Sequence, residues 1–247
     1  MINFSKISQK SFSGKVLRGI LKIIPKNSIL PILQGKLKGK KWVIGSGVFG
    51  YWLGTYELKK QKIFEGKVKK GDTVYDIGAH AGFYTLLAAE LVGEKGRVFS
   101  FEPNPRNTHY LENHITMNNY KNVTVLKTAV SEKTESRSFD VGENSFYGKF
   151  SETGKSKVET AALDDLYEKG ELPLPNVVKI DVEGVELAVL KGAELVFKKS
   201  LPLLFLSTHS QKLYDSCLNF LASLGYNFEV IDENEAKTDK EILAYSK

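Results

Sequence analysis

Residues 74–85, Val-Tyr-Asp-Ile-Gly-Ala-His-Ala-Gly-Phe-Tyr-Thr, constrain the fold of this chain more than any other stretch. The residues leading up to Ile77 are rich in β-branched and aromatic side chains, as in a buried strand. Gly78 and Gly82 then allow the backbone to pass close to a ligand, because glycine has no Cβ. Apolar residues follow at helical spacing: Phe83, Leu86, Leu87 and Leu91. The stretch predicts a strand, a glycine turn and a helix whose free N–H groups face the turn.

The residues of this turn indicate what it binds. A dinucleotide-binding turn has glycine at its first, third and sixth positions. Counted from Gly78, the third position is His80, whose bulk argues against a nicotinamide or flavin cofactor. Asp76, two residues earlier, would direct a carboxylate into the same pocket, which suits a cationic ligand. S-adenosylmethionine carries an ammonium, a sulfonium and no phosphate, so we predict that it binds here; a ligand-free strand and helix is the alternative.

A second strand is predicted over residues 97–101, and it ends in Glu102-Pro103. An acid about twenty residues beyond a glycine turn, at the tip of the next strand, typically accepts the ribose hydroxyls. We therefore expect Glu102 to contact the ribose, although a lone acid at a strand end is often only solvated. Asn104-Pro105 should begin the following helix, since asparagine is a good N-cap and proline suits the first turn.

Further strands are predicted over residues 176–180 and 203–206. Asp181 and Glu183 follow the first of them, and His209 follows the second. Ligands bind at the carboxyl ends of strands in open α/β sheets, so these side chains should meet Gly78 and Glu102 in one crevice. The two acids could serve as a general base, a substrate clamp or cation ligands, with helix capping as the alternative, and His209 could take a proton near neutral pH.

Three stretches resemble the FkbM family of S-adenosylmethionine-dependent methyltransferases: residues 75–85, residues 101–104, and residues 178–186 with 190–193. The run Lys-Ile-Asp-Val-Glu-Gly in the third stretch points to this family within the broader Rossmann-like class. The resemblance extends from about Tyr56 to the C-terminus. It implies an α/β Rossmann-like methyltransferase sheet, mostly parallel, with seven strands of which the last is antiparallel. An N-terminal extension and an inserted hairpin accompany the sheet.

The resemblance also implies the site residues. Cofactor contacts are expected from Asp76, Gly78, Ala79, His80, Gly82, Tyr84, Thr85, Glu102, Pro103 and Ala129. Glu57, on a helix predicted before the first strand, is a weaker candidate, because a solvated helix face explains it as well. Asp181, His209 and Glu183 are the expected catalytic residues. Relatives commonly have a carboxylate at the position of Ser207 and asparagine at that of His80. The identity of the general base and any requirement for a divalent cation therefore stay open, and no metal ligand is assigned.

Two segments depart from the alternation of strands and helices. We expect residues 1–54 to form a basic arm, with short strands over the glycine-punctuated residues 39–54 that contain Trp42 and Trp52. Residues 55–247 should form the methyltransferase domain. No acid occurs from Lys6 to Lys41, and residues 15–25 have the pattern of a basic amphipathic helix that would pack on the domain or lie on an anionic membrane. Residues 136–140 and 157–160 should form a hairpin that makes one wall of the acceptor pocket.

Composition sets the remaining expectations. Cys217 is the single cysteine, so we expect it in the core and expect no internal disulfide. We also expect a cytoplasmic protein whose contact with membranes is at most peripheral. We predict methyl transfer to a hydroxyl oxygen, and the resemblance implies sugars, glycans or secondary metabolites as acceptors. An RNA methyltransferase, suggested by the net charge of +6, and a non-catalytic module docking on a membrane or partner are the alternatives. The charge lies mostly outside the predicted catalytic domain, which disfavours nucleic acid; the acceptor and oligomeric state are not predicted.

Overall fold

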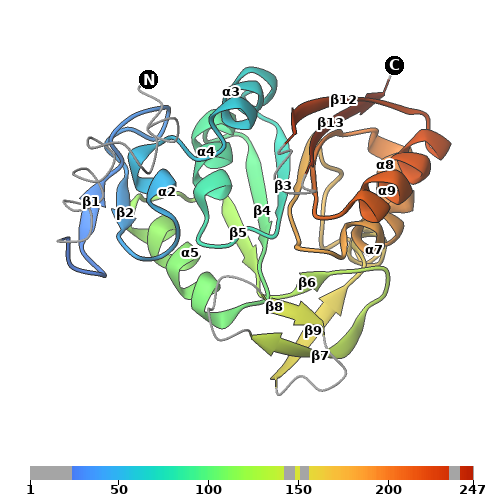
Figure 1. The fold of residues 1–247 in the computed structure, drawn as a ribbon, viewed down its shortest axis with the longest axis horizontal. Coiled ribbons are helices and arrows are strands. Elements are labelled where there is room, and N and C mark those ends of the chain that lie inside the picture. Colours follow the sequence, from blue (N-terminus) through green and yellow to red (C-terminus); the bar gives the residue numbers. More distant parts are fainter. Residues whose placement is uncertain (1–23, 142–147, 151–155, 234–239, 247) are drawn as a thin grey trace.

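A seven-stranded sheet forms the centre of the protein (Figure 1). The computed structural model describes residues 24–141, 148–150, 156–233 and 240–246. Five strands run parallel: β3 (Thr73–Ile77), β4 (Arg97–Phe101), β5 (Val123–Leu126), β10 (Val177–Ile180) and β11 (Leu203–Thr208). The last strand, β13 (Lys240–Ser246), is antiparallel to both of its neighbours, β11 and β12 (Tyr226–Glu233). The order β12-β13-β11-β10-β3-β4-β5 confirms the predicted fold class.

Helices cover both faces of this sheet, so its strands are apolar on both sides. On one face lie α3 (Leu58–Lys67), α4 (Phe83–Val92) and α5 (Pro105–Met117) (Figure 1). On the other lie α6 (Leu163–Glu168), α7 (Glu186–Lys191), α8 (Glu194–Ser200) and α9 (Gln211–Ser223). Val74 and Tyr75, which are adjacent in β3, belong to opposite core clusters, as the alternation of a strand requires. Cys217 is buried in α9, as expected.

The glycine turn after β3 is packed against protein backbone. Gly78 has φ +77°, and a Cβ there would lie 1.9 Å from the carbonyl oxygen of Asp181. Gly82 has φ +94°, and a Cβ there would lie 2.5 Å from the Leu111 side chain. The sequence predicts that the glycines allow the backbone to approach a ligand closely. At Gly78, the close approach is made to the backbone of Asp181, directly after β10. This packing joins the turn to Asp181.

The N-terminal segment packs on the same core as α4. β1 (Ile29–Pro31) pairs with β2 (Lys41–Val43), and α2 (Phe49–Leu53) follows. Short strands were predicted around both tryptophans; this holds for Trp42 in β2 and is wrong for Trp52, which lies in α2. The rings of Trp42 and His114 stack with centroids 3.8 Å apart, which fixes β2 on α5. The amphipathic helix predicted over residues 15–25 falls, except for its last two residues, outside the described part of the chain.

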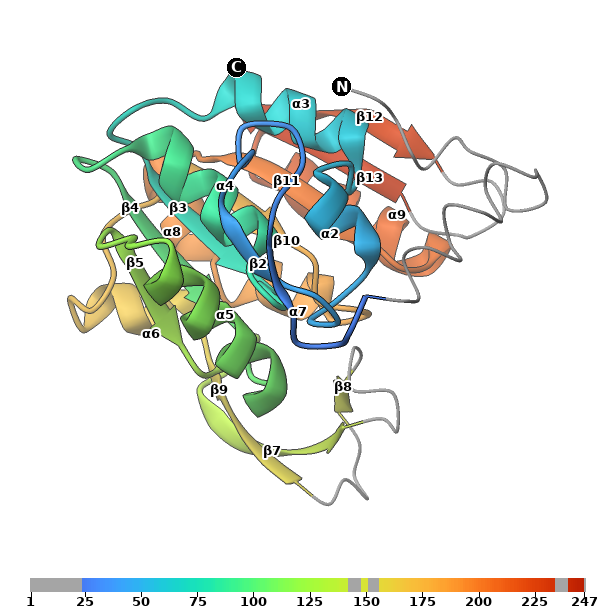
Figure 2. The same cartoon turned by 90° about the vertical axis from the view of Figure 1, so that its left-hand side faces the viewer.

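The insertion after β5 forms a second sheet. β7 (Glu135–Val141) and β9 (Ser156–Ala161) pair antiparallel, which confirms the predicted hairpin. β8 (Gly148–Phe150) and β6 (Ala129–Val130) extend it to four strands in the order β6-β9-β7-β8. Figure 2 shows this sheet projecting from the central one, beneath α5 in that view. Within the described residues, no helix has the length and apolar character needed to cross a membrane.

Candidate active site

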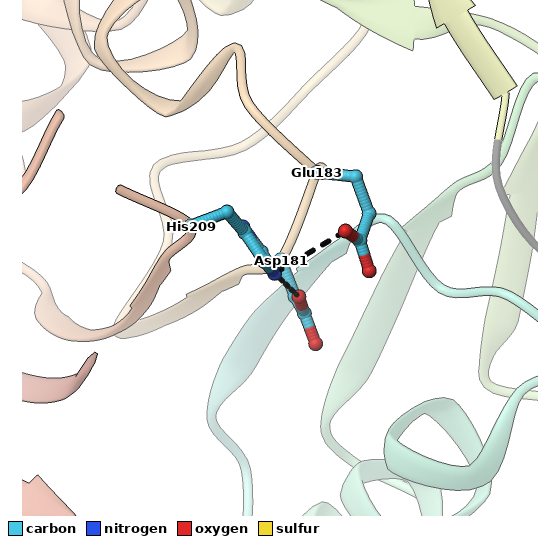
Figure 3. A group of neighbouring side chains, drawn as sticks. All are labelled: Asp181, Glu183 and His209. Carbon is cyan, nitrogen blue, oxygen red and sulfur yellow. Dashed lines mark ion pairs between the residues drawn. The ribbon is translucent and has the colours of Figure 1, made fainter. Parts of the chain in front are cut away.

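Three predicted catalytic side chains meet beyond the carboxyl ends of β10 and β11 (Figure 3). His209 Nε2 lies 3.5 Å from Asp181 Oδ1 and 3.6 Å from Glu183 Oε2. β10 and β11 are parallel neighbours with Ile180 opposite Leu206, so the residues that follow both strands emerge side by side. Glu183 reaches the group from a strained backbone, because its φ of +53° lies in the left-handed region.

A buried carboxylate orients His209. Glu186, the first residue of α7, is fully buried, and its Oε1 lies 2.5 Å from His209 Nδ1. The same oxygen accepts the Gly184 N–H at 2.9 Å. Burial lowers the pKa of His209, but the hydrogen bond to Glu186 and the charges of Asp181 and Glu183 outweigh it and raise this pKa to about 9. Positive charge at Nε2, whether a proton or a metal ion, is therefore favoured, and Nε2 faces the two other acids.

Asp181 is the acid best placed to stay ionised. Burial raises the pKa of its carboxyl, but the positive charges of Lys179 and Lys60 outweigh burial and lower it. Its Oδ2 lies 3.9 Å from Lys179 Nζ. Asp181 can therefore accept a proton or a cation at neutral pH.

Asp76, predicted to direct its carboxylate toward the cofactor, is paired within the protein. It is buried; its Oδ1 lies 3.1 Å from Lys179 Nζ, and its Oδ2 accepts the Thr85 hydroxyl at 2.6 Å. The reason is register, because Lys179 stands directly opposite Asp76 across β10 and β3, and a buried ammonium requires a partner. Lys179 Nζ also donates to the Gly78 carbonyl at 3.0 Å. Asp76 and Thr85 therefore hold the base of the glycine turn.

Glu102 fixes the same turn from the tip of β4. Its Oε2 accepts the His80 N–H at 2.8 Å, and its Oε1 accepts the Asn104 N–H at 2.9 Å. His80 has φ +51°, so this bond holds a backbone that side chains rarely adopt. Burial raises the pKa of Glu102, and the two backbone N–H groups only partly oppose this. Glu102 lies where the sequence predicted, beside the turn; its ribose contact stays a prediction.

A second polar cluster, not predicted from the sequence, lies beside Asp181. The buried Lys60 Nζ lies 2.8 Å from both Ser207 Oγ and Glu241 Oε2, and 3.1 Å from Glu57 Oε2. Ser207 stands opposite Glu241 across β11 and β13 and donates to it at 2.9 Å. A carboxylate from β13, that of Glu241, thus lies next to Ser207. The sequence signal was the Glu57-to-Lys60 spacing of a helical ion pair.

The remaining predicted cofactor residues lie at the same end of the sheet or just beside it. Tyr84 is buried in α4, with its ring centroid 5.3 Å from Lys60 Nζ and 5.5 Å from Lys179 Nζ. Ala79 is buried in the glycine turn, and Pro103 directly follows Glu102. Ala129 lies in β6, paired with Thr160 of the second sheet.

Acidic side chains outnumber cations around this end of the sheet. The acids are Glu57, Asp76, Asp181, Glu183, Glu186 and Glu241, against the lysines Lys60 and Lys179 and the His209 imidazolium. A partly buried site with excess negative charge favours cationic ligands. S-adenosylmethionine, with its ammonium and sulfonium, fits this field.

Comparisons with known proteins identify the family of the chain. A family model described as the methyltransferase FkbM domain matches residues 76–228, more than half of the chain. Among curated proteins, the chain is similar to the hexuronic acid methyltransferase AglP of Haloferax volcanii, with 34% identity over 131 residues. That match covers 51% of this chain and 52% of AglP, so the chain spans about half the length of this relative.

Two solved structures share the fold. Methyltransferase FkbM from Methylobacillus flagellatus superposes with a TM-score of 0.56 at 19% identity, over 80% of this chain and 53% of that one. Aeropyrum pernix fibrillarin, which holds bound S-adenosyl-L-methionine, superposes with a TM-score of 0.52 at 14% identity, over 76% of this chain and 74% of that one. The chain belongs to the FkbM family of S-adenosylmethionine-dependent methyltransferases.

Proposed function

We propose that this protein transfers the methyl group of S-adenosylmethionine to a hydroxyl oxygen of a sugar, with a hexuronic acid as the first candidate. The observation that carries the proposal is the position of the Asp181–His209 pair. Asp181 directly follows β10, and His209 directly follows β11. The pair lies beside the glycine turn, because Gly78 packs against the backbone of Asp181. The similarity to AglP, a hexuronic acid methyltransferase, supports the choice of acceptor.

The residues present fit the cofactor. Glu102 lies at the tip of β4, and its Oε2 retains a lone pair after accepting the His80 N–H, so it can still accept a ribose hydroxyl. Its Oε1 already accepts from the Asn104 N–H and the Asn107 side chain. Glu57, at the start of α3 with φ +45°, adds a carboxylate for the ammonium group. When bound, S-adenosylmethionine supplies a methyl group on a sulfonium, which is already a good leaving group.

The contribution of the protein is to orient the acceptor and to take its proton. As the oxygen–methyl bond forms, the methyl–sulfur bond breaks with its electron pair on sulfur, and the hydroxyl proton must leave. Asp181 is the proposed proton acceptor, because its lowered pKa keeps it ionised near neutral pH. His209 stabilises the Asp181 carboxylate next to it. The oxygen and nitrogen atoms of this group also have the composition of a divalent-cation site.

The test uses two acceptors that differ only in their carboxylate, namely oligosaccharides ending in glucuronic acid or in glucose. The full chain is incubated with S-adenosylmethionine, and the products are analysed by mass spectrometry for the gain of one methyl group. We expect methylation of the acidic acceptor in preference to the neutral one. Methylation of neither sugar by protein that binds the cofactor would contradict a sugar hydroxyl as acceptor.

A further inference from the structure

We propose that Asp181, Glu183 and His209 bind one divalent transition cation of the Mn²⁺ type, which holds two oxygen atoms of the acceptor. The inference deepens the proposed function and rests on it for the nature of the acceptor. The cation site itself rests only on the geometry of these side chains.

The spacing of the three ligand atoms suits one ion. They all lie within 4.8 Å of one another, with His209 Nε2 3.5 Å and 3.6 Å from the two carboxylate oxygens. Adjacent ligands of a six-coordinate ion bound at about 2.1 Å are about 3 Å apart, so small side-chain movements close the site. Good hydrogen bonds to nitrogen span about 2.7–3.2 Å, so these longer separations are less typical of direct pairing. Figure 3 shows the three side chains converging from separate points of the chain.

The surroundings of His209 provide an independent observation. Metal-bound histidines typically donate their other ring N–H to a carboxylate, and Glu186 occupies that position at Nδ1. Glu186 is fully buried, and its Oε2 has no hydrogen-bond partner within the described residues. A buried carboxylate oxygen without a partner is unfavourable unless positive charge lies nearby. A cation at Nε2 supplies that charge through the imidazole.

The ligand types select the ion. Ca²⁺ and Mg²⁺ prefer oxygen ligands, whereas imidazole suits transition metals and carboxylates suit Mn²⁺. Two carboxylates and one imidazole therefore favour a six-coordinate ion such as Mn²⁺ over Mg²⁺ or Ca²⁺. Three coordination positions are then left for water or for acceptor oxygens.

The cation also answers an electrostatic difficulty. Acids outnumber cations around the crevice, so an acceptor that carries a carboxylate would be repelled. A divalent ion reverses the local field and can chelate the reacting hydroxyl together with a neighbouring carboxylate or hydroxyl. The predicted substrate class is therefore a sugar with two adjacent oxygen ligands, one of them the methylated oxygen.

The test measures Mn²⁺ binding to the full chain by electron paramagnetic resonance, with the metal alone and neither cofactor nor acceptor. We expect one saturable site per chain, at least tenfold weaker in Glu183→Gln. Glu194→Gln, which changes an exposed acid of α8, is the matched control and should bind as the wild type does. Glu186→Gln should weaken binding by about 10–100-fold through the orientation of His209.

Two results would overturn the site: no saturable Mn²⁺ binding by folded wild-type protein, or equal binding by wild type and Glu183→Gln. Circular dichroism confirms that each variant is folded. Because acceptor and cofactor are absent, Mn²⁺ binding without methylation of sugars would reject the proposed function and keep the site. Methylation of sugars without Mn²⁺ binding would keep the proposed function and reject the cation site.

Discussion

Removing Lys179 should destabilise the protein by leaving a buried carboxylate without its partner. In Lys179→Met the buried carboxylate of Asp76 loses the ammonium 3.1 Å away. At an effective dielectric constant of about 20, that pair is worth about 5 kcal/mol of Coulomb energy. Removing one partner of a buried ion pair typically costs about 3–5 kcal/mol, because the other charge stays buried without compensation. We therefore expect a loss of about 3–5 kcal/mol in the free energy of unfolding at pH 7.

A second substitution tests whether the loss comes from the unpaired Asp76 carboxylate. Adding Asp76→Asn removes the buried charge and keeps an acceptor for the Thr85 hydroxyl, so the double variant should recover most of the loss.

Urea unfolding followed by tryptophan fluorescence measures all four proteins of this cycle. The summed losses of unfolding free energy in the two single variants should exceed the loss in the double variant by about 2 kcal/mol or more at pH 7. Losses that simply add would refute the view that this ion pair holds the glycine turn.

Three other predictions concern the turn, the base and a buried histidine. Gly78→Ala should lose more than about 2 kcal/mol of unfolding free energy or fail to fold, because the new Cβ would lie 1.9 Å from the Asp181 carbonyl oxygen. As a control, Gly66→Ala in α3 has open space around the new Cβ and should stabilise the protein by up to about 1 kcal/mol. Asp181→Asn should lower turnover about 10²–10⁴-fold while adenosylhomocysteine affinity, measured by calorimetry, changes little; unchanged turnover would remove Asp181 from the mechanism. Burial lowers the pKa of His114 to about 4, so the unfolded chain takes up a proton at higher pH than the folded protein does. The free energy of unfolding should therefore fall by about 2–3 kcal/mol as pH falls from 7 to 4.5. His114→Gln should lose correspondingly less in urea titrations, and an equal loss in both proteins would contradict this.

Much of the fold could be predicted because it follows from local patterns. Strands β3, β4 and β10 are short apolar runs, and the glycines after β3 can adopt the positive φ that the turn requires. The meeting of Asp181, Glu183 and His209 also followed from sequence, since the carboxyl ends of parallel strands share one edge. Trp52 was misassigned because glycines on both sides of it suggest turns between strands as readily as a short helix.

The charge pairs could not be predicted, because they depend on register and on distant contacts. Lys179 pairs with Asp76 only because β10 and β3 align these two residues. Lys60 and Ser207 are 147 positions apart, and no pattern in the sequence joins them to Glu241. The membrane contact suggested for the basic arm concerns residues outside the described part of the chain and stays a prediction.

The central claim is that the crevice beside Glu102 and the glycine turn binds S-adenosylmethionine. Isothermal titration calorimetry with S-adenosylhomocysteine tests it directly, on wild type, on Glu102→Gln, and on Glu112→Gln as an exposed control in α5. We predict one molecule bound per chain, with affinity at least tenfold weaker in Glu102→Gln and unchanged in Glu112→Gln. Heat from NAD with none from S-adenosylhomocysteine, or equal affinity in all three proteins, would contradict the account.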